Sequence, residues 1–380
     1  MSDWPIPRRC PGQPLDGVRV LDFSTLVPGP LATLLLAEAG ADVVKVERPG
    51  AGDEMRTYLP RLGTDAANFA LLNRGKRSVT ADLKDPSARD HVLQLAAQCH
   101  ILVDQFRPGV MDRLGLGYDH VRHVNPAVVY CSITGYGQDG PDAQRAGHDL
   151  NYLAESGLLG LARGADGSPG LPFTVVADLA GGAYPAVMNI LLALISARAS
   201  GTGAHLDVSM SDNVLTLAYG ALAEHAARGT WPPPGAALLT GGSPRYNIYA
   251  TADGRHLAAA PLEDRFWHRF AELIGLSDAL RDYDEGDPDA AAQVVRAVAD
   301  LIASQTAALW VDRFTDLDVC CSVVATSEEA YARFLSDSSP DHRICGDGFD
   351  VAALPVPVAP ALRGAPRAEG YPALGENGAC

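Results

Sequence analysis

Several signatures of common enzyme classes are missing from this 380-residue chain. Its seven cysteines form no C-x-x-C pair and are odd in number, which favours a reduced, cytoplasmic protein over a disulfide framework. Its histidines lack metal-ligand spacing, so no metal site is expected. The first turn, Ser24–Pro30, is no G-x-G-x-x-G run, and Gly115-Leu-Gly117 lacks the third glycine and follows no strand. No G-x-x-x-x-G-K-[ST] or G-x-S-x-G run occurs either, which together counts against nicotinamide dehydrogenases, P-loop enzymes and α/β-hydrolases.

Lysine is also scarce, and positive charge is confined to one end. The three lysines, Lys45, Lys76 and Lys84, all lie in the first quarter of a chain whose net charge is −16. Residues 1–145 hold sixteen Lys and Arg against seventeen Asp and Glu, whereas the remainder holds fourteen against twenty-nine. Nucleic acid binding requires a broad basic face, so we expect no nucleic acid partner. One small polyanion in the N-terminal half is compatible with this distribution.

The most apolar stretch, Leu171–Ala197, carries a single charge, Asp178. Its hydrophobicity could indicate a membrane helix, but Gly181, Gly182, Pro185 and Asn189 interrupt it, and we expect no membrane partner. The pattern predicts a strand-like segment over 173–177 and then Asp178 at the start of a helix buried in a large core. Such a carboxylate is a candidate base or nucleophile, or else a helix N-cap.

Strand and helix patterns alternate through the first 135 residues. Apolar runs predict strands, and amphipathic segments with start and stop residues predict helices, at 18–23, 30–39, 42–46, 78–81, 86–97, 101–104, 118–124 and 127–133 in chain order. This alternation predicts an α/β fold with a doubly wound sheet and ligands at the carboxyl ends of its strands. Cations follow several of those ends and suit a phosphorylated carrier: Arg48, Asn73–Arg77, Lys84, Arg107 and Arg113.

The second half changes in character. The pattern predicts a strand over 205–210, a helix over 212–226 and a Pro- and Gly-rich linker over 232–242. A hairpin over 246–260, turning at Asp253-Gly254, and helices over 263–273 and 290–306 would form a second, smaller domain.

Five segments in order resemble the class III (family III) coenzyme A transferases: Gly17-Val-Arg-Val-Leu-Asp-Phe23, Pro28-Gly-Pro30, Gly40-Ala-Asp-Val-Val-Lys-Val-Glu-Arg-Pro49, Asn73-Arg-Gly-Lys-Arg-Ser78 and Phe106-Arg-Pro-Gly109. The resemblance implies a Rossmann-like doubly wound large domain (1–205, completed by 335–380), a linker (206–242) and a smaller α+β domain (243–334). It also implies an interlocked-ring homodimer and an acyl-CoA ligand, with coenzyme A as part of the substrate and no separate cofactor. The implied CoA-binding residues are Arg48, Ala81, Lys84, Gln105, Phe106, Arg107, Arg113, Gly147 and Tyr152.

Within this family three segments resemble the α-methylacyl-CoA racemase branch: Gly147-His-Asp-Leu-Asn-Tyr152, Ala177-Asp-Leu-Ala-Gly-Gly182 and Pro261-Leu-Glu-Asp264. The resemblance implies His148 and Asp178 as catalytic groups and Glu263 as the residue that orients the histidine. Inverting a carbon next to a thioester requires two acid–base groups, one on each face. Imidazole titrates near neutral pH, and burial can bring a carboxyl group there. The first N–H groups of the Asp178 helix, over 178–180, are expected to stabilise the enolate oxygen.

Two other functions stay open. A CoA transferase would use Asp178 as nucleophile, through a covalent aspartyl thioester, although that reaction gives His148 no role. A non-catalytic acyl-CoA-binding homologue would predict a broken His148 or Asp178. The acyl chain, and which base serves which enantiomer, are not specified by the sequence. The chain departs from the family at Cys320-Cys321, where the usual run is C-V-T-P-V, and at Arg245, where racemases tend to carry a smaller or aromatic residue.

Overall fold

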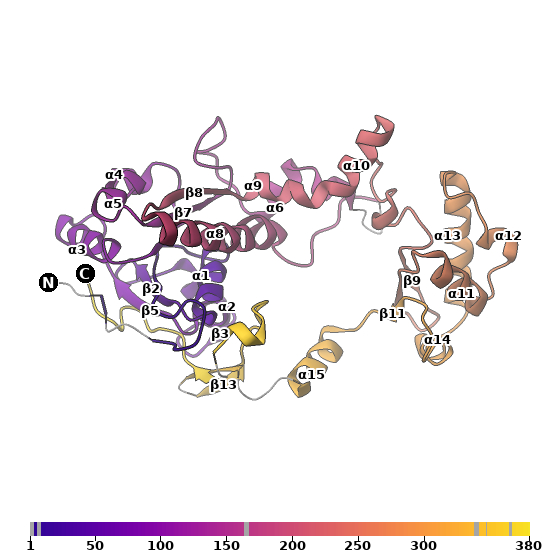
Figure 1. Cartoon of the computed structure of the whole chain (residues 1–380). Coiled ribbons are helices and arrows are strands. Elements are labelled where there is room, and N and C mark those ends of the chain that lie inside the picture. Colours follow the sequence, from indigo (N-terminus) through magenta and orange to yellow (C-terminus); the bar gives the residue numbers. More distant parts are fainter. Residues whose placement is uncertain (1–3, 6–8, 163–166, 338–341, 347, 365–366) are drawn as a thin grey trace. The chain divides into compact units, whose positions relative to one another are not determined.

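The computed structural model describes residues 4–5, 9–162, 167–337, 342–346, 348–364 and 367–380. The chain divides into two compact units (Figure 1). Unit 1 comprises Met1–Ser156, Phe173–Val214 and Asp337–Cys380, and unit 2 comprises Gly157–Pro172 and Leu215–Ser336.

Unit 1 is built on a six-stranded, fully parallel sheet. Across the sheet the strands are ordered β5 (Arg77–Thr80), β2 (Asp42–Glu47), β1 (Arg19–Asp22), β6 (Ile101–Asp104), β7 (Val129–Thr134) and β8 (Ala204–Ser209). The chain runs outward from β1 in one direction and then outward from β6 in the other. The predicted doubly wound α/β fold is therefore confirmed, and its topological switch point lies between β1 and β6.

Helices cover both faces of this sheet, because successive strand residues point to opposite sides. Leu21, Leu102 and Tyr130 pack in one buried cluster with side chains of α3 (Pro86–Ala96) and α5 (Tyr118–Val124). On the other face Asp22 meets α1 (Pro28–Glu38), which lies beside α8 (Tyr184–Ser200). The order of these layers can be followed in Figure 1.

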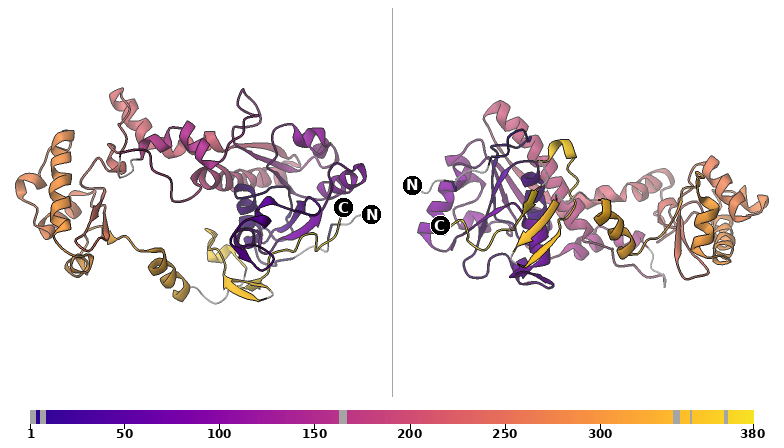
Figure 2. Two further views of the ribbon diagram at one scale, coloured as in Figure 1. Left: turned by 180° about the vertical axis from the view of Figure 1, so that it is seen from behind. Right: turned by 90° about the horizontal axis from the view of Figure 1, so that it is seen from below.

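Shorter elements complete unit 1. They are η1 (Glu54–Thr57), β3 (Arg61–Leu62), β4 (Asp65–Ala66), α2 (Ala67–Asn73), α4 (Val110–Arg113), α6 (Asp149–Glu155), α9 (Met210–Asn213) and η5 (Pro360–Leu362). A three-stranded sheet of β12 (His342–Gly346), β13 (Phe349–Ala352) and β14 (Arg367–Glu369) belongs to the C-terminal tail. The tail, yellow in Figure 2, returns to the main sheet, where the Thr80 N–H donates to the Gly378 carbonyl at 3.1 Å.

The apolar stretch around Asp178 differs from the prediction in two ways. Residues 173–176 form no strand. Instead Ala177–Ala183 is a π-helix, η2, which continues into α8. A strand needs a pairing neighbour, whereas here Phe173 is 97% exposed and the first helical N–H groups are satisfied by a carboxylate from α6.

The helix is also not buried all round. Ala186, Ile190 and Leu194 are buried against the unit, but a second set of apolar side chains lies on the surface of α8. This exposed stripe comprises Tyr184, Met188, Leu192 and Ile195, which are 43%, 57%, 61% and 68% exposed.

Among the described residues, the helical stretch Ala177–Ser200 has the length and apolar composition needed to cross a membrane. A second candidate would arise only if Pro288–Ala303 and Ala307–Phe314, which meet at 102°, formed one span. Ala177–Ser200 packs against α1, β7 and β8, as the core helix of an α/β unit does.

Unit 2 combines a small antiparallel sheet with helices. Its strands are ordered β11 (Cys321–Val323), β10 (His256–Ala259) and β9 (Asn247–Ala250), and the predicted hairpin is confirmed. Gly254 makes the turn with φ of +75°, a value that glycine adopts without strain. The helices are α7 (Leu158–Leu161), η3 (Val214–Ala218), which begins at the unit boundary, α10 (Tyr219–Arg228), η4 (Leu238–Thr240), α11 (Asp264–Ile274), α12 (Asp278–Arg281), α13 (Pro288–Ala303), α14 (Ala307–Phe314) and α15 (Ser327–Asp337).

A separate core holds unit 2 together. Trp267 and Phe270 of α11, Val294 and Val298 of α13, and Trp310 of α14 are almost completely buried in one cluster. The single helix predicted over 212–226 is instead divided into α9, η3 and α10.

Candidate functional site

A cavity of about 410 Å³ opens at the topological switch point of unit 1. Its walls come from the segments that follow β1, β6, β7 and β8 and from the start of α6. Ligands of open α/β sheets bind at this position because the loops diverge there. The lining includes Leu26, Pro28, Gln105, Phe106, Arg107, Gly135, Tyr136, Arg145, Gly147, His148, Asn151, Tyr152, Asp178 and Met210.

His148 is positioned as the N-cap of α6. Its backbone N–H donates to Asn151 Oδ1 at 3.0 Å, and its carbonyl accepts from the Asn151 N–H at 2.8 Å. The imidazole is exposed and has no hydrogen-bond partner in the part of the chain that the structure describes. Its backbone is thus fixed while its ring stays available to a ligand in the cavity.

Asp178 lies in the first turn of η2, half-buried at the same cavity. Burial, followed by the charge of Asp149, raises the pKa of Asp178 to about 7. The carboxyl group can therefore both accept and donate a proton near neutral pH.

Asp149 was not among the predicted site residues. Its Oδ1 atom accepts from the backbone N–H groups of Ala177 at 2.6 Å and Asp178 at 3.0 Å, which joins α6 to η2. Only its place beside His148 in the G-H-D run pointed to it. The Leu179 N–H donates to the Val175 carbonyl at 3.2 Å. The expectation that residues 178–180 offer free N–H groups to an enolate is therefore wrong for Asp178 and Leu179.

Gly147 and Tyr152 support the histidine turn. The Tyr152 hydroxyl donates to the Gly147 carbonyl at 2.6 Å, and its ring packs edge-on against Tyr136 with centroids 5.2 Å apart. A Cβ on Gly147 would lie 2.7 Å from Tyr152 Cε1, so only glycine fits. Burial and the Asp178 charge raise the pKa of Tyr152 to about 12, so the phenol stays neutral.

Gln105, Phe106 and Arg107 leave the end of β6 and line the cavity, as their predicted contact with one ligand requires. Arg107 is exposed, and Gln105 Oε1 accepts from the Gly29 N–H at 3.1 Å. Arg145 also lines the cavity and was missed. It pairs with Glu155 at 2.6 Å and Asp142 at 3.0 Å.

The other predicted CoA contacts lie outside the cavity lining. Arg48 follows β2 and is exposed, with Nε 3.0 Å from the Gly52 carbonyl oxygen. Ala81 is buried and Lys84 exposed, both after β5, and Arg113 is exposed at the end of α4. Because all strands are parallel, Arg48, the residues after β5 and those after β6 follow the same edge of the sheet. Their contact with coenzyme A stays a prediction.

One predicted cation group has a different role. In Asn73–Arg77, Arg74 pairs with Glu38 at 2.8 Å, Lys76 with Asp22 at 3.3 Å, and Arg77 with Asp42. Arg74 and Lys76 are buried, so these charges neutralise internal carboxylates. The expectation that this group faces a phosphorylated ligand is wrong.

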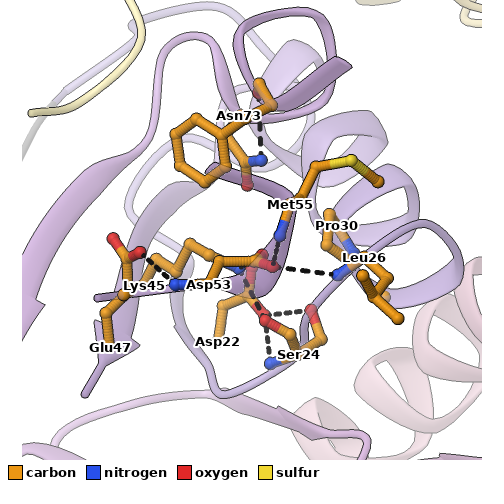
Figure 3. Close-up of polar contacts among 12 residues, drawn as sticks. Asp22, Ser24, Leu26, Pro30, Lys45, Glu47, Asp53, Met55 and Asn73 are labelled. Carbon is orange, nitrogen blue, oxygen red and sulfur yellow. Dashed lines mark hydrogen bonds and ion pairs between the residues drawn. The ribbon is translucent and has the colours of Figure 1, made fainter. Parts of the chain in front are cut away.

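A buried ionic network lies behind the loop after β1, which lines the cavity (Figure 3). Lys45 Nζ is 2.9 Å from Asp53 Oδ2 and donates to the Ser24 carbonyl, and both charged side chains are fully buried. Asp53 Oδ1 accepts from the N–H groups of Met55 at 2.9 Å and Leu26 at 3.2 Å. Leu26, which lines the cavity, has φ of +61°, an unfavourable value for a leucine. The network therefore stabilises a conformation of the loop after β1 that is unfavourable by itself.

Glu263 belongs to unit 2, where it is exposed as the N-cap of α11. Its predicted role toward His148 stays a prediction. Arg245 is 11% exposed at its side chain, pairs with Asp264 and Glu285 at 2.7 Å each, and lies over the Trp267 ring. This departure from the family pattern thus serves the packing of unit 2.

The Cys320 departure carries backbone strain, with φ of +47° just before β11. Burial and then the charge of Glu263 raise the pKa of its thiol. No cluster of three or more His, Cys, Asp or Glu suited to a metal ion occurs among the described residues.

A model of the CoA-transferase family III matches residues 15–377, nearly the whole chain. The chain belongs to this family. Human α-methylacyl-CoA racemase is 33% identical to it over 371 residues, covering 96% of this chain and 91% of that protein. Human succinyl-CoA:glutarate CoA-transferase is 41% identical over 209 residues, covering 54% of this chain and 48% of that protein. A crystal structure of a CAIB/BAIF family protein from Brucella suis superimposes with a TM-score of 0.80 at 26% identity, covering 96% of this chain and 97% of the other.

Family III membership makes the chain an enzyme of the CoA-transferase and racemase group. Its relatives include both racemases and CoA transferases, so the two reactions have to be distinguished by the geometry of the site. The predicted family resemblance is confirmed.

Proposed function

We propose that this protein racemises 2-methylacyl-CoA thioesters by 1,1-proton transfer through an enolate. The observation that carries the proposal is that His148 and Asp178 line one cavity, with the pKa of Asp178 raised to about 7. One group removes the C2 proton, the C2–H electron pair forms the enolate, and the other group returns a proton to the opposite face. The raised pKa of Asp178 lies in the range where such exchange is efficient.

Glu263 is proposed to orient His148, as the resemblance implies. Orientation by a carboxylate fixes the tautomer of an imidazole and stabilises its protonated form. Coenzyme A itself is proposed to lie along the sheet edge, with its phosphates against Arg48, Lys84, Arg107 and Arg113. Guanidinium groups bind phosphate oxygens through charge-assisted hydrogen bonds.

An apolar cavity of about 710 Å³ in unit 2 supports an apolar acyl chain. Its wall at Ala258–Ala260 ends three residues before Glu263. The remaining lining includes Leu158, Leu161, Leu217, Leu239, Tyr246 and Ile248.

The second candidate is a CoA transferase with Asp178 as nucleophile. The 41% identity to a transferase over half of the chain favours it. Nucleophilic attack requires the ionised carboxylate, and a pKa of about 7 leaves much of Asp178 protonated near neutral pH. The same value suits an acid–base group, so racemisation is the better fit. In a non-catalytic acyl-CoA-binding protein, the raised pKa of Asp178 would serve no function.

We also propose a homodimer in a reducing, cytoplasmic environment. The exposed stripe of α8 is the apolar surface that a second copy would cover. No disulfide links the cysteines among the described residues, which accords with a reducing compartment.

Deuterium exchange tests the reaction. A single enantiomer of a 2-methylacyl-CoA, incubated with the enzyme in deuterium oxide, should invert and gain deuterium at C2 without any acceptor acid. His148→Ala and Asp178→Ala should each abolish inversion. Acceptor-dependent CoA exchange without deuterium at C2, with an acyl group on Asp178 that hydroxylamine can trap, would establish the transferase instead.

A further inference from the structure

Gln105 is held in a fixed orientation by the first turn of α1. That turn reads Pro28-Gly29-Pro30, and the two prolines have no N–H group. The Gly29 N–H donates to Gln105 Oε1 at 3.1 Å. Because this N–H needs an acceptor, the carbonyl oxygen of the Gln105 amide faces α1, and the NH₂ group faces away from it.

The NH₂ group of Gln105 is free to bind a ligand. No described residue accepts a hydrogen bond from it, and the side chain lines the cavity that also holds His148 and Asp178. The amide is neutral, so it donates at every pH at which the enzyme is folded.

The support behind Gln105 is rigid. A Cβ on Gly29 would lie 2.1 Å from Ser24 Cβ and 2.8 Å from Gln105 Oε1, so the three residues are closely packed. Ser24 is fixed in turn by Asp22, whose Oδ1 accepts from the Ser24 N–H at 2.9 Å, and by Lys45, which donates to the Ser24 carbonyl (Figure 3). A donor on such a support costs little reorganisation during the reaction.

The reaction needs a donor in this cavity, and the first three N–H groups of η2 are engaged within the protein. When the C2 proton leaves, the carbonyl π electrons move to the thioester oxygen, which becomes an enolate oxygen. The N–H groups of Ala177, Asp178 and Leu179 are already bonded within the protein. We infer that the Gln105 amide N–H donates to the thioester oxygen of the bound acyl-CoA and stabilises the enolate. The inference rests on the proposed function in that a thioester carbonyl must enter this cavity.

Gln105→Glu is the decisive variant, because the carboxylate keeps an acceptor for the Gly29 N–H but has no N–H to donate. We expect the rate of C2 deuterium exchange at saturating substrate to fall at least about 100-fold, as when one oxyanion donor is lost. Gln105→Ala should also lose activity, with Gln98→Glu, just after α3, as the control that retains it. Circular dichroism and thermal melts establish that each variant is folded.

A thioether analogue of the substrate separates this contact from CoA binding, because it lacks the carbonyl oxygen. Its dissociation constant should be unchanged in Gln105→Glu, within about threefold, a difference under 1 kcal/mol. Exchange within threefold of wild type, or thioether affinity lost as strongly as the rate, would overturn the inference.

Failure of the proposed function would be visible separately, as a wild-type enzyme that exchanges no C2 hydrogen. If that enzyme instead transfers CoA, the tetrahedral intermediate develops charge on the same thioester oxygen. Gln105→Glu should then lower the transfer rate to the same extent, and an unchanged transfer rate would overturn the inference in that case.

Discussion

The carboxylate of Asp149 accepts a hydrogen bond from the backbone N–H of Asp178 at 3.0 Å, so a buried acid is held beside the one that lines the cavity. Asp149 thereby fixes the start of η2, and its charge disfavours ionisation of its neighbour. One side chain thus both positions Asp178 and helps to set its proton affinity.

Replacing Asp149 with asparagine should lower the pKa of Asp178, because it removes a like charge while keeping a carbonyl acceptor for the helix N–H groups. In the direction where Asp178 is the base, the wild-type rate should rise as pH increases through about 7. The variant should reach its plateau at lower pH. Initial exchange rates for each enantiomer between pH 5 and 9 would show this, with Asp142→Asn as an exposed control. If the exchange rate of the variant rose over the same pH range as that of the wild type, the predicted effect of Asp149 on the pKa of Asp178 would be contradicted.

Lys45→Met should destabilise unit 1 strongly. The change leaves Asp53 buried without its cation and removes the hydrogen bond to the Ser24 carbonyl. Breaking a buried ion pair in this way costs about 3–5 kcal/mol. Urea denaturation followed by circular dichroism would measure the loss. Lys84→Met, at an exposed lysine, should change the free energy of unfolding by less than about 0.5 kcal/mol.

Arg48→Ala and Arg113→Ala should each weaken binding of every acyl-CoA by a similar factor, of about tenfold for a loss of 1.5 kcal/mol. Salt should weaken wild-type binding more than binding by either variant, because screening acts on the charges that were removed. Calorimetric titration with free coenzyme A at two ionic strengths would test this. Arg122→Ala on α5, where Arg122 pairs with Asp119, serves as the control. Unchanged affinity in both variants would place the phosphates elsewhere.

Leu192→Asp should disrupt the proposed homodimer, because it introduces a charge into the centre of the exposed stripe of α8. Sedimentation velocity at micromolar concentration should show wild type as a dimer and the variant at lower mass. Leu309→Asp, at a comparably exposed leucine on α14, should leave the dimer intact. A folded wild-type monomer at that concentration would refute the dimer itself.

The sequence predicted the sheet of unit 1 well because its inner parallel strands are buried on both faces and appear as short apolar runs. The hairpin of unit 2 followed from Asp253-Gly254 for a similarly local reason. His148, Asp178 and the residues after β6 were found because each lies in a distinctive run, and the fold brings them to one cavity.

The predictions that were wrong concern contacts between residues far apart in the sequence. The sequence of residues 173–177 does not show that Asp149, nearly thirty residues earlier, accepts hydrogen bonds from the first N–H groups of η2. Likewise, the Asn73–Arg77 run has the composition of a phosphate site. Only the fold shows that Glu38, Asp22 and Asp42 neutralise its charges.

The burial of Lys45 and Lys76 has a chemical consequence for an enzyme of this family. Thioesters acylate free amines spontaneously, and an amine whose pKa is lowered is the more reactive because more of it is unprotonated. Lys76 has a pKa lowered to about 8 by burial, yet its side chain, like that of Lys45, is fully enclosed. Lys84 is the one lysine side chain exposed to solvent. The chain therefore presents its own substrates with almost no lysine to modify, and should resist self-acylation during turnover.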